Sequence, residues 1–369
     1  MERIQKNFGF GCMRLKLTGG EVDTALLSRI VDRLMERGFN YFDTAHGYLG
    51  GKSETALREC LTRRYPRERY VLTDKLTDGF FQTQADIRPL FRQQLEACGV
   101  EYFDFYLMHA QNAENFQKFK RCRAYETALE LMSEGKFRHF GISFHDKAAV
   151  LEQILTEYPQ IEVVQLQLNY IDWEDPAVES RKCWEVCRRL GKKVIVMEPC
   201  RGGNLASLPQ DARAVLDGLG GGSPASYAIR FAAGHEGVVM VLSGMTSLEQ
   251  VEDNLSFMER FRPLDRRELQ AVEQVRDILR SKRTVPCTAC GYCTGGCPMH
   301  IAIPDLFACL NNQKIYPDWN SEFYYGVYTA HNGKASSCIR CGACEAACPQ
   351  RLPIRALLET AARTFEKNG

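Results

Sequence analysis

Residues 23–44 read DTALLSRIVDRLMERGFNYFDT. From Leu26 to Leu34, apolar residues recur every three or four positions, which is typical of the buried face of an α-helix. Residues 39–44 then form a short apolar run, which favours a buried strand. A helix that leads directly into a buried strand is the repeating unit of an α/β fold with a parallel sheet.

The same alternation continues to about residue 254. Eight apolar runs of strand length are separated by amphipathic segments, at residues 8–12, 39–44, 70–75, 103–109, 138–143, 163–168, 193–198 and 238–243. Eight such units predict a TIM (β/α)8 barrel, in which the chemistry lies at the carboxyl ends of the strands. A doubly wound open sheet is the alternative, but no GxGxxG motif follows the first run to support it.

The overall composition narrows the class of protein. The chain has 369 residues, 45% of them hydrophobic, with 47 Lys+Arg against 46 Asp+Glu. This length favours a large barrel or two unequal domains, and the near-neutral charge without a polybasic run argues against a nucleic-acid partner. The N-terminal segment lacks a secretory pattern and no membrane-spanning apolar run occurs, so we expect a cytoplasmic protein with no membrane partner.

The composition changes abruptly after the charged, helix-like segment 263–283. Nine of the 16 cysteines follow residue 286, and eight of these form two copies of the pattern C-x2-C-x2-C-x3-C-P. We therefore predict two domains, a barrel at 1–280 and a second domain at 281–369. Cysteines at such short, repeated spacings indicate metal binding in a reducing compartment rather than disulfides.

The cysteine pattern is typical of 4Fe-4S ligands, in which three close thiolates hold one cluster and the fourth binds the other. It assigns Cys287, Cys290, Cys293 and Cys348 to one cluster, and Cys338, Cys341, Cys344 and Cys297 to the second. Structural zinc sites use two Cys pairs separated by a longer loop, so zinc is the weaker interpretation.

This second domain resembles bacterial two-cluster ferredoxins at all eight cysteines and both prolines. Its spacer, 299–337, is longer than in compact ferredoxins and resembles the helical ferredoxin modules of electron-transfer enzymes. The resemblance implies a mainly α-helical domain, with two short helices between the repeats and a third at 355–365. Two clusters favour electron transfer, to the protein's own barrel or to a redox partner protein, over a purely structural role.

Four polar residues follow the ends of predicted barrel strands. Asp43 and Tyr48 lie in the motif DTAHGY, Lys75 ends the third run, and His109 ends the fourth. An ammonium lowers the pKa of a nearby phenol, a carboxylate holds the ammonium, and an imidazole can orient a carbonyl group. This set suits reduction of a small-molecule carbonyl compound or oxidation of an alcohol.

With these four residues in order, the barrel resembles the aldo-keto reductase family over roughly residues 1–260. The resemblance implies that Tyr48 is the general acid/base, that Lys75 and Asp43 tune it, and that His109 orients the substrate. It also implies NADP or NAD as cofactor. The expected cofactor-binding residues are Ser143, Gln165, Gly202, Gly203, Ser243, Gly244, Glu249, Asp253 and Asn254.

Several positions depart from the family pattern. Phe144 stands where an Asn usually follows Ser143, and Met197 replaces an aromatic residue that stacks on the nicotinamide ring. Gly244 and Gln250 stand where basic residues usually hold the 2'-phosphate of NADP. A 2'-phosphate prefers paired cations. Either NADH is used, another residue supplies the charge, or nicotinamide binding has weakened.

Three hypotheses of function follow. The first is an anaerobic, NAD(P)H-linked oxidoreductase whose clusters are redox-active or structural. The second is a reductase without nicotinamide, fed single electrons through the clusters, and the third is a non-catalytic electron-transfer subunit. Hydride transfer moves two electrons while a cluster passes one, and no flavin motif is present to convert between them. The first ranks ahead of the second because the four catalytic residues and much of the cofactor pattern occur together.

Substrate choice depends on the loops that follow the strands. The candidate loops are 111–121, 170–175 and 205–222. The aromatic run 323–325 is expected to pack beneath the clusters rather than to contact substrate.

Overall fold

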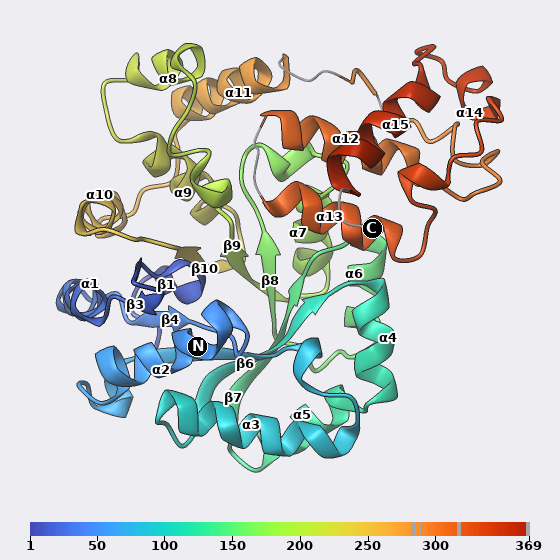
Figure 1. Ribbon diagram of the computed structural model, residues 1–369. Coiled ribbons are helices and arrows are strands. Elements are labelled where there is room, and N and C mark those ends of the chain that lie inside the picture. The colour runs from blue at the N-terminus through green and yellow to red at the C-terminus, as the bar shows by residue number, and fades with distance from the viewer. Residues whose placement is uncertain (282–284, 288, 316–318, 367–369) are drawn as a thin grey trace.

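Eight parallel strands form a closed barrel, in the order β1-β10-β9-β8-β7-β6-β5-β4 (Figure 1). The computed structural model describes residues 1–281, 285–287, 289–315 and 319–366. The barrel strands are β1 (Phe8–Gly11), β4 (Tyr41–Asp43), β5 (Val71–Leu76), β6 (Phe103–Gln111), β7 (Phe137–Phe144), β8 (Val163–Gln167), β9 (Lys193–Met197) and β10 (Val238–Ser243). Each overlaps one of the eight predicted runs, so the (β/α)8 barrel is confirmed.

Helices surround the barrel. They are α1 (Thr24–Glu36), α2 (Lys52–Leu57), α3 (Gln84–Cys98), α4 (Ala113–Arg121), α5 (Ala124–Ser133), α6 (Ala148–Glu157), α7 (Ser180–Arg189), α8 (Gln210–Asp217), α9 (Pro224–Ala233), α10 (Leu248–Met258) and α11 (Arg266–Ser281). The Asp23 side chain accepts a hydrogen bond from the Leu26 amide, which fixes where α1 begins. A short antiparallel hairpin, β2 (Leu17–Thr18) and β3 (Glu21–Val22), was not expected from the sequence.

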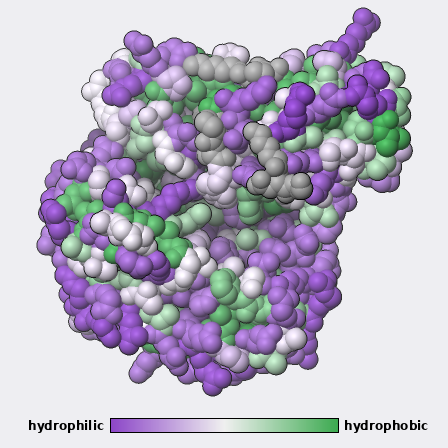
Figure 2. Space-filling model, viewed as in Figure 1, coloured by the Kyte–Doolittle hydropathy of each residue, from purple (hydrophilic) through white to green (hydrophobic). Residues whose placement is uncertain are grey.

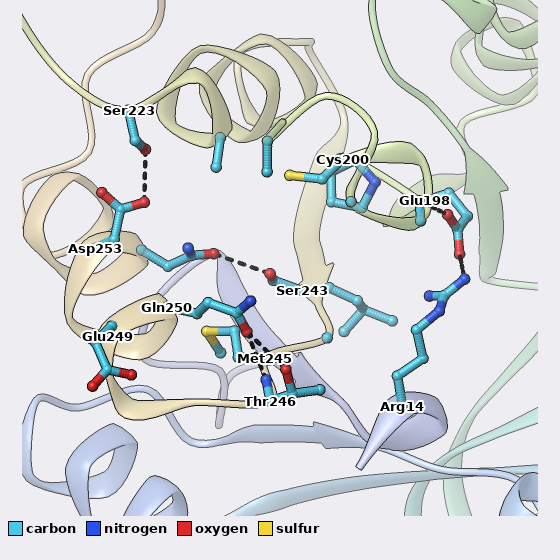
Figure 3. Close-up of a pocket in the computed structure, with 18 residues that line it drawn as sticks. Arg14, Glu198, Cys200, Ser223, Ser243, Met245, Thr246, Glu249, Gln250 and Asp253 are labelled. Atoms are coloured by element: carbon cyan, nitrogen blue, oxygen red, sulfur yellow. Dashed lines mark hydrogen bonds and ion pairs between the residues drawn. The ribbon is translucent and has the colours of Figure 1, made fainter. Parts of the chain in front are cut away.

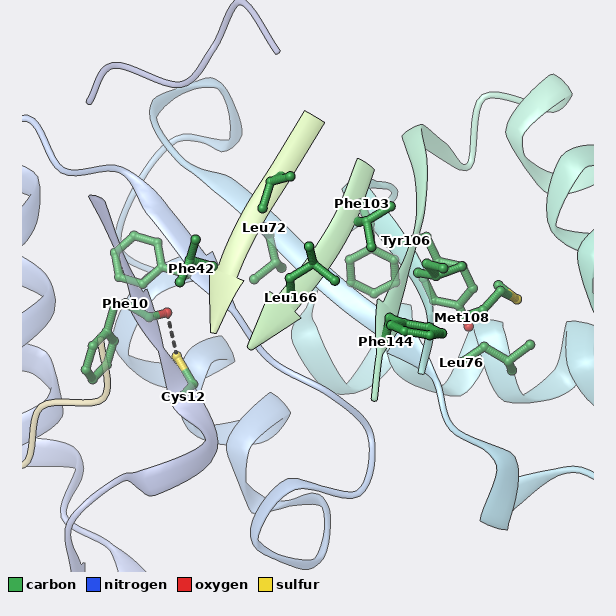
Figure 4. Close-up of a cluster of buried hydrophobic side chains, with 14 of the residues drawn as sticks. Phe10, Cys12, Phe42, Leu72, Leu76, Phe103, Tyr106, Met108, Phe144 and Leu166 are labelled. Carbon is green, nitrogen blue, oxygen red and sulfur yellow. Dashed lines mark hydrogen bonds between the residues drawn. The ribbon is translucent and has the colours of Figure 1, made fainter. Parts of the chain in front are cut away.

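The hydrophobic residues form an outer and an inner core. The outer core packs the strands against the helices, with Phe10, Phe42, Leu72 and Leu166 among its members (Figure 4). Alternate residues of the same strands point into the barrel, where they form a second core that includes Tyr41, Phe105, Val163 and Met240. In β7 only glycine fits at position 141, because a Cβ there would lie 2.4 Å from Cγ2 of Val163.

The C-terminal region is helical, as predicted. Two helices lie between the cysteine repeats, α12 (Ile303–Ile315) and α13 (Trp319–Thr329); α14 (Ala343–Ala346) lies within the second repeat, and α15 (Ile354–Phe365) follows it. These elements share a core that includes Leu306, Phe307, Tyr324 and Leu358. Helix α11 packs against α8 on the barrel side, and the proposed boundary near residue 281 stays a prediction.

The helical region lies beside α6 and α7 (Figure 1). At the start of α6, the Lys147 ammonium bonds Asp305 of α12 at 2.6 Å and lies 4.7 Å from the ring centre of Tyr328. The Tyr328 hydroxyl donates to the carbonyl oxygen of Ala177, which packs in the core of the helical region. The loop after β8 and the start of α6 therefore hold this region at the carboxyl end of the barrel.

The visible surface is mostly hydrophilic, with hydrophobic patches scattered over it (Figure 2). No helix in the described part of the chain is long and apolar enough to cross a membrane.

Candidate active site

The four predicted catalytic residues meet at the carboxyl end of the barrel. Asp43 is the last residue of β4, Lys75 lies near the end of β5, and His109 lies near the end of β6. Tyr48 begins a short 3-10 turn that follows β4. Because parallel strands end at the same rim, residues from three strands face one space.

Lys75 is the centre of this group. Its ammonium donates to Oδ1 of Asp43 at 2.6 Å, to the Thr44 carbonyl oxygen at 2.7 Å and to the Tyr48 hydroxyl oxygen at 3.2 Å. The side chain is fully buried, and Asp43 is only 2% exposed. Burial is the largest single influence and disfavours the charged ammonium, but Asp43 and Tyr48 together outweigh it, and the pKa of Lys75 is raised. The buried lysine therefore stays charged beside the phenol.

The structure corrects the expectation for Tyr48. Burial raises the pKa of its phenol above the ordinary value, and the Lys75 ammonium offsets only part of that increase. Tyr48 is therefore protonated at neutral pH and held ready as an acid. The sequence could not show this, because the extent of burial depends on the packing around the barrel mouth.

His109 faces Tyr48 across the site, with ring centres 5.7 Å apart. Its Nδ1 lies 2.7 Å from the Thr77 hydroxyl. Burial, with a smaller contribution from Lys75, holds the pKa of His109 well below its ordinary value. A neutral imidazole can donate one N–H to a substrate oxygen without adding a charge to the site.

A cavity of about 320 Å³ opens above these residues. Tyr48, His109, Ser143 and Gln165 line its floor, and the amide of Gln165 donates to Asp43 at 3.2 Å. Its remaining lining residues are Gly11, Met13, Arg14, Asp43, Ala110, His145, Met197, Glu198, Leu242, Gly244, Trp319 and Phe323. None of the loops 111–121, 170–175 and 205–222 lines this cavity in the described chain, although Ala206 lines the adjoining one, and their part in substrate choice stays a prediction.

Helix α13 contributes two aromatic residues to the wall of this cavity. Phe323 packs against the helical core as expected, but it also lines the cavity together with Trp319. Tyr324 and Tyr325 do pack in the helical core as expected. His145 was missed, although it follows Ser143 by two positions at the end of β7 and so faces the same rim.

A second cavity, of about 420 Å³ (Figure 3), adjoins the first. The two cavities share Arg14, Glu198, Leu242 and Gly244. It contains most of the residues that the resemblance assigned to a nucleotide: Gly202, Gly203, Ser243, Gly244, Glu249, Asp253 and Asn254. They lie on the turn after β9, the end of β10 and the first turns of α10. The backbone N–H groups at the start of α10 are the donors that a pyrophosphate requires.

The charges around this second cavity are mostly negative. Glu198, Glu249 and Asp253 line it, and Arg14 is the single cation among its described lining residues. Arg14 is paired with Glu198 at 2.7 Å, and the other Glu198 oxygen accepts from the Gly202 amide at 2.5 Å. Gln250 stands where the family usually has a basic residue for the 2'-phosphate. Its side-chain oxygen accepts a hydrogen bond from the Thr246 amide (Figure 3).

The eight predicted cluster ligands fall into two groups around two small hollows of the helical region. Cys287, Cys290, Cys293 and Cys348 line one, and Cys297, Cys338, Cys341 and Cys344 line the other. This is the crossed pairing that the motif predicts. Apolar residues complete both walls, and Ile303 at the start of α12 lines both hollows. Four thiols around an apolar hollow fit a 4Fe-4S cluster.

The backbone repeats itself along with the cysteines, at an offset of 51 residues, which separates Cys287 from Cys338. Ala289 and Arg340 have φ values of 56° and 59°, and Gly291 and Gly342 have values of 77° and 81°. The Ala289 amide in this bend donates to Sγ of Cys287 at 3.4 Å. Positive φ on either side of the second cysteine turns amides toward the sulfur atoms, where a thiolate is stabilised.

Comparison with known proteins agrees with both parts of the chain. The aldo/keto reductase family model matches residues 7–277, and a 4Fe-4S dicluster domain model matches residues 267–353. An NADH-specific methylglyoxal reductase of Escherichia coli is 27% identical in an alignment 274 positions long that covers 61% of this chain and 81% of that protein. An uncharacterized oxidoreductase of Bacillus subtilis is 24% identical in an alignment 307 positions long that covers 75% of this chain and 95% of that protein.

Solved structures show the same barrel. The holo form of an aldo-keto reductase from Bacillus halodurans has a TM-score of 0.61 at 24% identity, and covers 73% of this chain and 91% of that one. An aldo-keto reductase from Klebsiella pneumoniae in complex with NADPH has a TM-score of 0.60 at 20% identity, and the match covers 73% of this chain and 90% of that one.

Fold and site together define an oxidoreductase built on a parallel barrel, with its Tyr, Lys, Asp and His residues at the carboxyl end of the strands. The chain belongs to the aldo/keto reductase family, and a 4Fe-4S dicluster domain follows its barrel.

Proposed function

We propose that the barrel reduces a small-molecule carbonyl compound with NADH, and oxidises the corresponding alcohol in reverse, while the C-terminal domain 281–369 holds two 4Fe-4S clusters. The observation that carries this proposal is the buried Lys75, which bonds both Asp43 and Tyr48 at the floor of an open cavity. A nicotinamide nucleotide, when bound, supplies or takes up a hydride.

Tyr48 transfers the proton in this scheme. During reduction, its hydroxyl donates to the carbonyl oxygen as negative charge grows there. The phenolate that forms on Tyr48 lies beside the Lys75 ammonium, which stabilises it. Asp43 and the Thr44 carbonyl hold that ammonium in place, so no reorganisation is needed at the moment of proton transfer.

His109 orients the substrate. Because its imidazole is neutral, it donates one hydrogen bond to the same oxygen and leaves the proton transfer to Tyr48. The bond between Nδ1 and the Thr77 hydroxyl fixes the plane of the ring. The two donors together position the carbonyl carbon over the floor of the cavity.

The second cavity would hold the nucleotide, through Ser143 and Gln165 at the nicotinamide end and through Gly202, Gly203, Ser243, Gly244, Glu249, Asp253 and Asn254 along its length. Its acidic lining and its single, already paired cation Arg14 disfavour a 2'-phosphate. NADH is therefore the better fit. The NADH specificity of the Escherichia coli relative supports the same choice.

We place the protein in the cytoplasm of an anaerobic cell, where the cysteines stay reduced and the clusters intact. The clusters would exchange single electrons with a redox partner protein.

A second candidate function is favoured by one observation: α13 of the cluster domain lines the substrate cavity. In that case bound clusters would supply two electrons one at a time, without nicotinamide, and Tyr48 would supply one of the two protons while solvent supplies the other.

Equilibrium binding of NADH and NADPH to the anaerobically purified, cluster-replete protein tests the proposal. We expect NADH to bind in the micromolar range and NADPH more weakly. Binding of neither nucleotide would refute the proposed hydride chemistry and favour the single-electron alternative. The Tyr48→Phe variant serves as control, because it should bind nucleotide normally while losing turnover.

A further inference from the structure

The substrate cavity is built by two parts of the chain that lie far apart in sequence. Its floor and inner wall come from the barrel strands, but Trp319 and Phe323 of α13 form part of its wall. The two ring centres lie 5.6 Å apart and the ring planes are inclined at 70°, so the wall presents ring surfaces in two directions. Met13 and Met197 add two thioether side chains to the lining.

Trp319 is poised for contact with a ligand. It is 36% exposed, more than is usual for a tryptophan that only packs one domain on another. The guanidinium of Arg14 lies 6.0 Å from its ring centre and marks the rim of the cavity. Phe323 is supported by a second cavity residue, because its ring centre lies 4.9 Å from that of His145.

The charged groups of the cavity are already satisfied within the protein. Asp43 is paired with Lys75 and Glu198 with Arg14. Burial lowers the pKa of His145 to about 4, so this imidazole is neutral, as is His109. A phosphate or carboxylate on the substrate would find no unpaired cation among the described lining residues, so the cavity favours an uncharged molecule.

We propose that Trp319 and Phe323 are specificity-determining residues supplied by the cluster domain, and that the substrate is an uncharged carbonyl compound with a flat apolar group, an aromatic or conjugated ring. The proposal rests on the proposed carbonyl reduction and adds the substrate class to it. Aromatic rings pack well against tryptophan and phenylalanine faces and against methionine sulfur. The cavity of about 320 Å³ also receives the nicotinamide end of the nucleotide at Ser143 and Gln165, so the remaining space suits one small molecule of this kind.

The first test compares an aromatic with a small aliphatic aldehyde. With NADH as reductant, kcat/KM is measured for 2-naphthaldehyde and for propanal. We expect Trp319→Ala to lower kcat/KM for 2-naphthaldehyde about tenfold and that for propanal by less than about twofold. Trp319→Phe should retain most of the activity toward the aromatic aldehyde. The matched control is Leu269→Ala, which removes a 41% exposed side chain from α11, away from the cavity.

The second test does not require turnover. Calorimetry measures the affinity of the cluster-replete protein for 2-naphthalenemethanol, and we expect Trp319→Ala to weaken it about tenfold while Leu269→Ala leaves it unchanged. If this effect appears but NADH supports no turnover, the carbonyl reduction fails and the aromatic site stands. If NADH turnover is normal but Trp319→Ala affects both aldehydes equally, or neither, the aromatic site is overturned and the reduction stands.

Discussion

Replacing Lys75 by Met tests the centre of the proposed mechanism. The ammonium lies 3.2 Å from the Tyr48 oxygen, and at an effective dielectric constant of ~20 Coulomb's law gives ~5 kcal/mol between it and a phenolate. Solvent at the half-buried phenol screens part of this, and the phenolate is only partly formed in the transition state. We therefore expect kcat for carbonyl reduction to fall about 10²- to 10³-fold, at ~1.4 kcal/mol for each factor of ten.

The pH dependence gives the same substitution a second signature. In alcohol oxidation, Tyr48 must lose its proton, so the rate rises with pH through the pKa of Tyr48. Burial raises this pKa and Lys75 opposes the increase. Without Lys75 the rising limb should move to higher pH. The assay is kcat against pH for NAD-linked oxidation of 2-naphthalenemethanol, in native and Lys75→Met protein.

Fold must be checked, since Asp43 loses its buried partner. The double variant Asp43→Asn/Lys75→Met removes both charges and should fold as the native protein does by circular dichroism. A folded double variant with native kcat, or with the limb at its native pH, would refute the electrostatic role of Lys75.

Four further predictions follow from individual residues. Tyr48→Phe should lower kcat at least about 10²-fold yet keep the visible absorbance of the clusters; native turnover would exclude it as the acid. Gln250→Arg should improve NADPH binding about tenfold relative to NADH, measured by cofactor fluorescence, and an unchanged ratio would show that the 2'-phosphate lies elsewhere. Because the pKa of His109 is held well below its ordinary value, carbonyl reduction should show no limb near pH ~6.5, and a limb there that disappears in His109→Asn would contradict its neutral state. Lys147→Met should lower the free energy of unfolding, measured by thermal unfolding, by about 1 kcal/mol, because it removes the 2.6 Å ion pair with Asp305. If the effects of Lys147→Met and Asp305→Asn simply add in the double variant, the ion pair contributes nothing to stability.

Most of the fold could be predicted because its signals are local. The apolar runs that became β1 and β4 to β10 are short segments whose period and flanking helices reveal them without knowledge of their neighbours. The hairpin of β2 and β3 could not be predicted because each strand has only two residues, too few to show the alternation of apolar and polar residues typical of a strand.

The catalytic group was also predictable, since a parallel barrel brings the strand ends to one rim. Asp43, Lys75 and His109 needed only their places at the ends of three strands to be grouped. The direction in which the pKa of Tyr48 is shifted was not predictable. Its pKa depends on how far the surrounding chain removes it from water, and burial outweighs the ammonium that was expected to dominate.

The sequence by itself determined the eight strands, the grouping of the four candidate catalytic residues and the crossed sets of cysteines, because each depends on spacing along a short stretch of chain. Only the tertiary structure decided that α13 lines the proposed substrate cavity. It also decided that Arg14 forms an ion pair with Glu198, 184 residues away. Such contacts form where two distant segments pack together through side chains of no distinctive pattern. The physical reason is that packing across domains depends on shape and burial, which leave no periodic signal in a sequence.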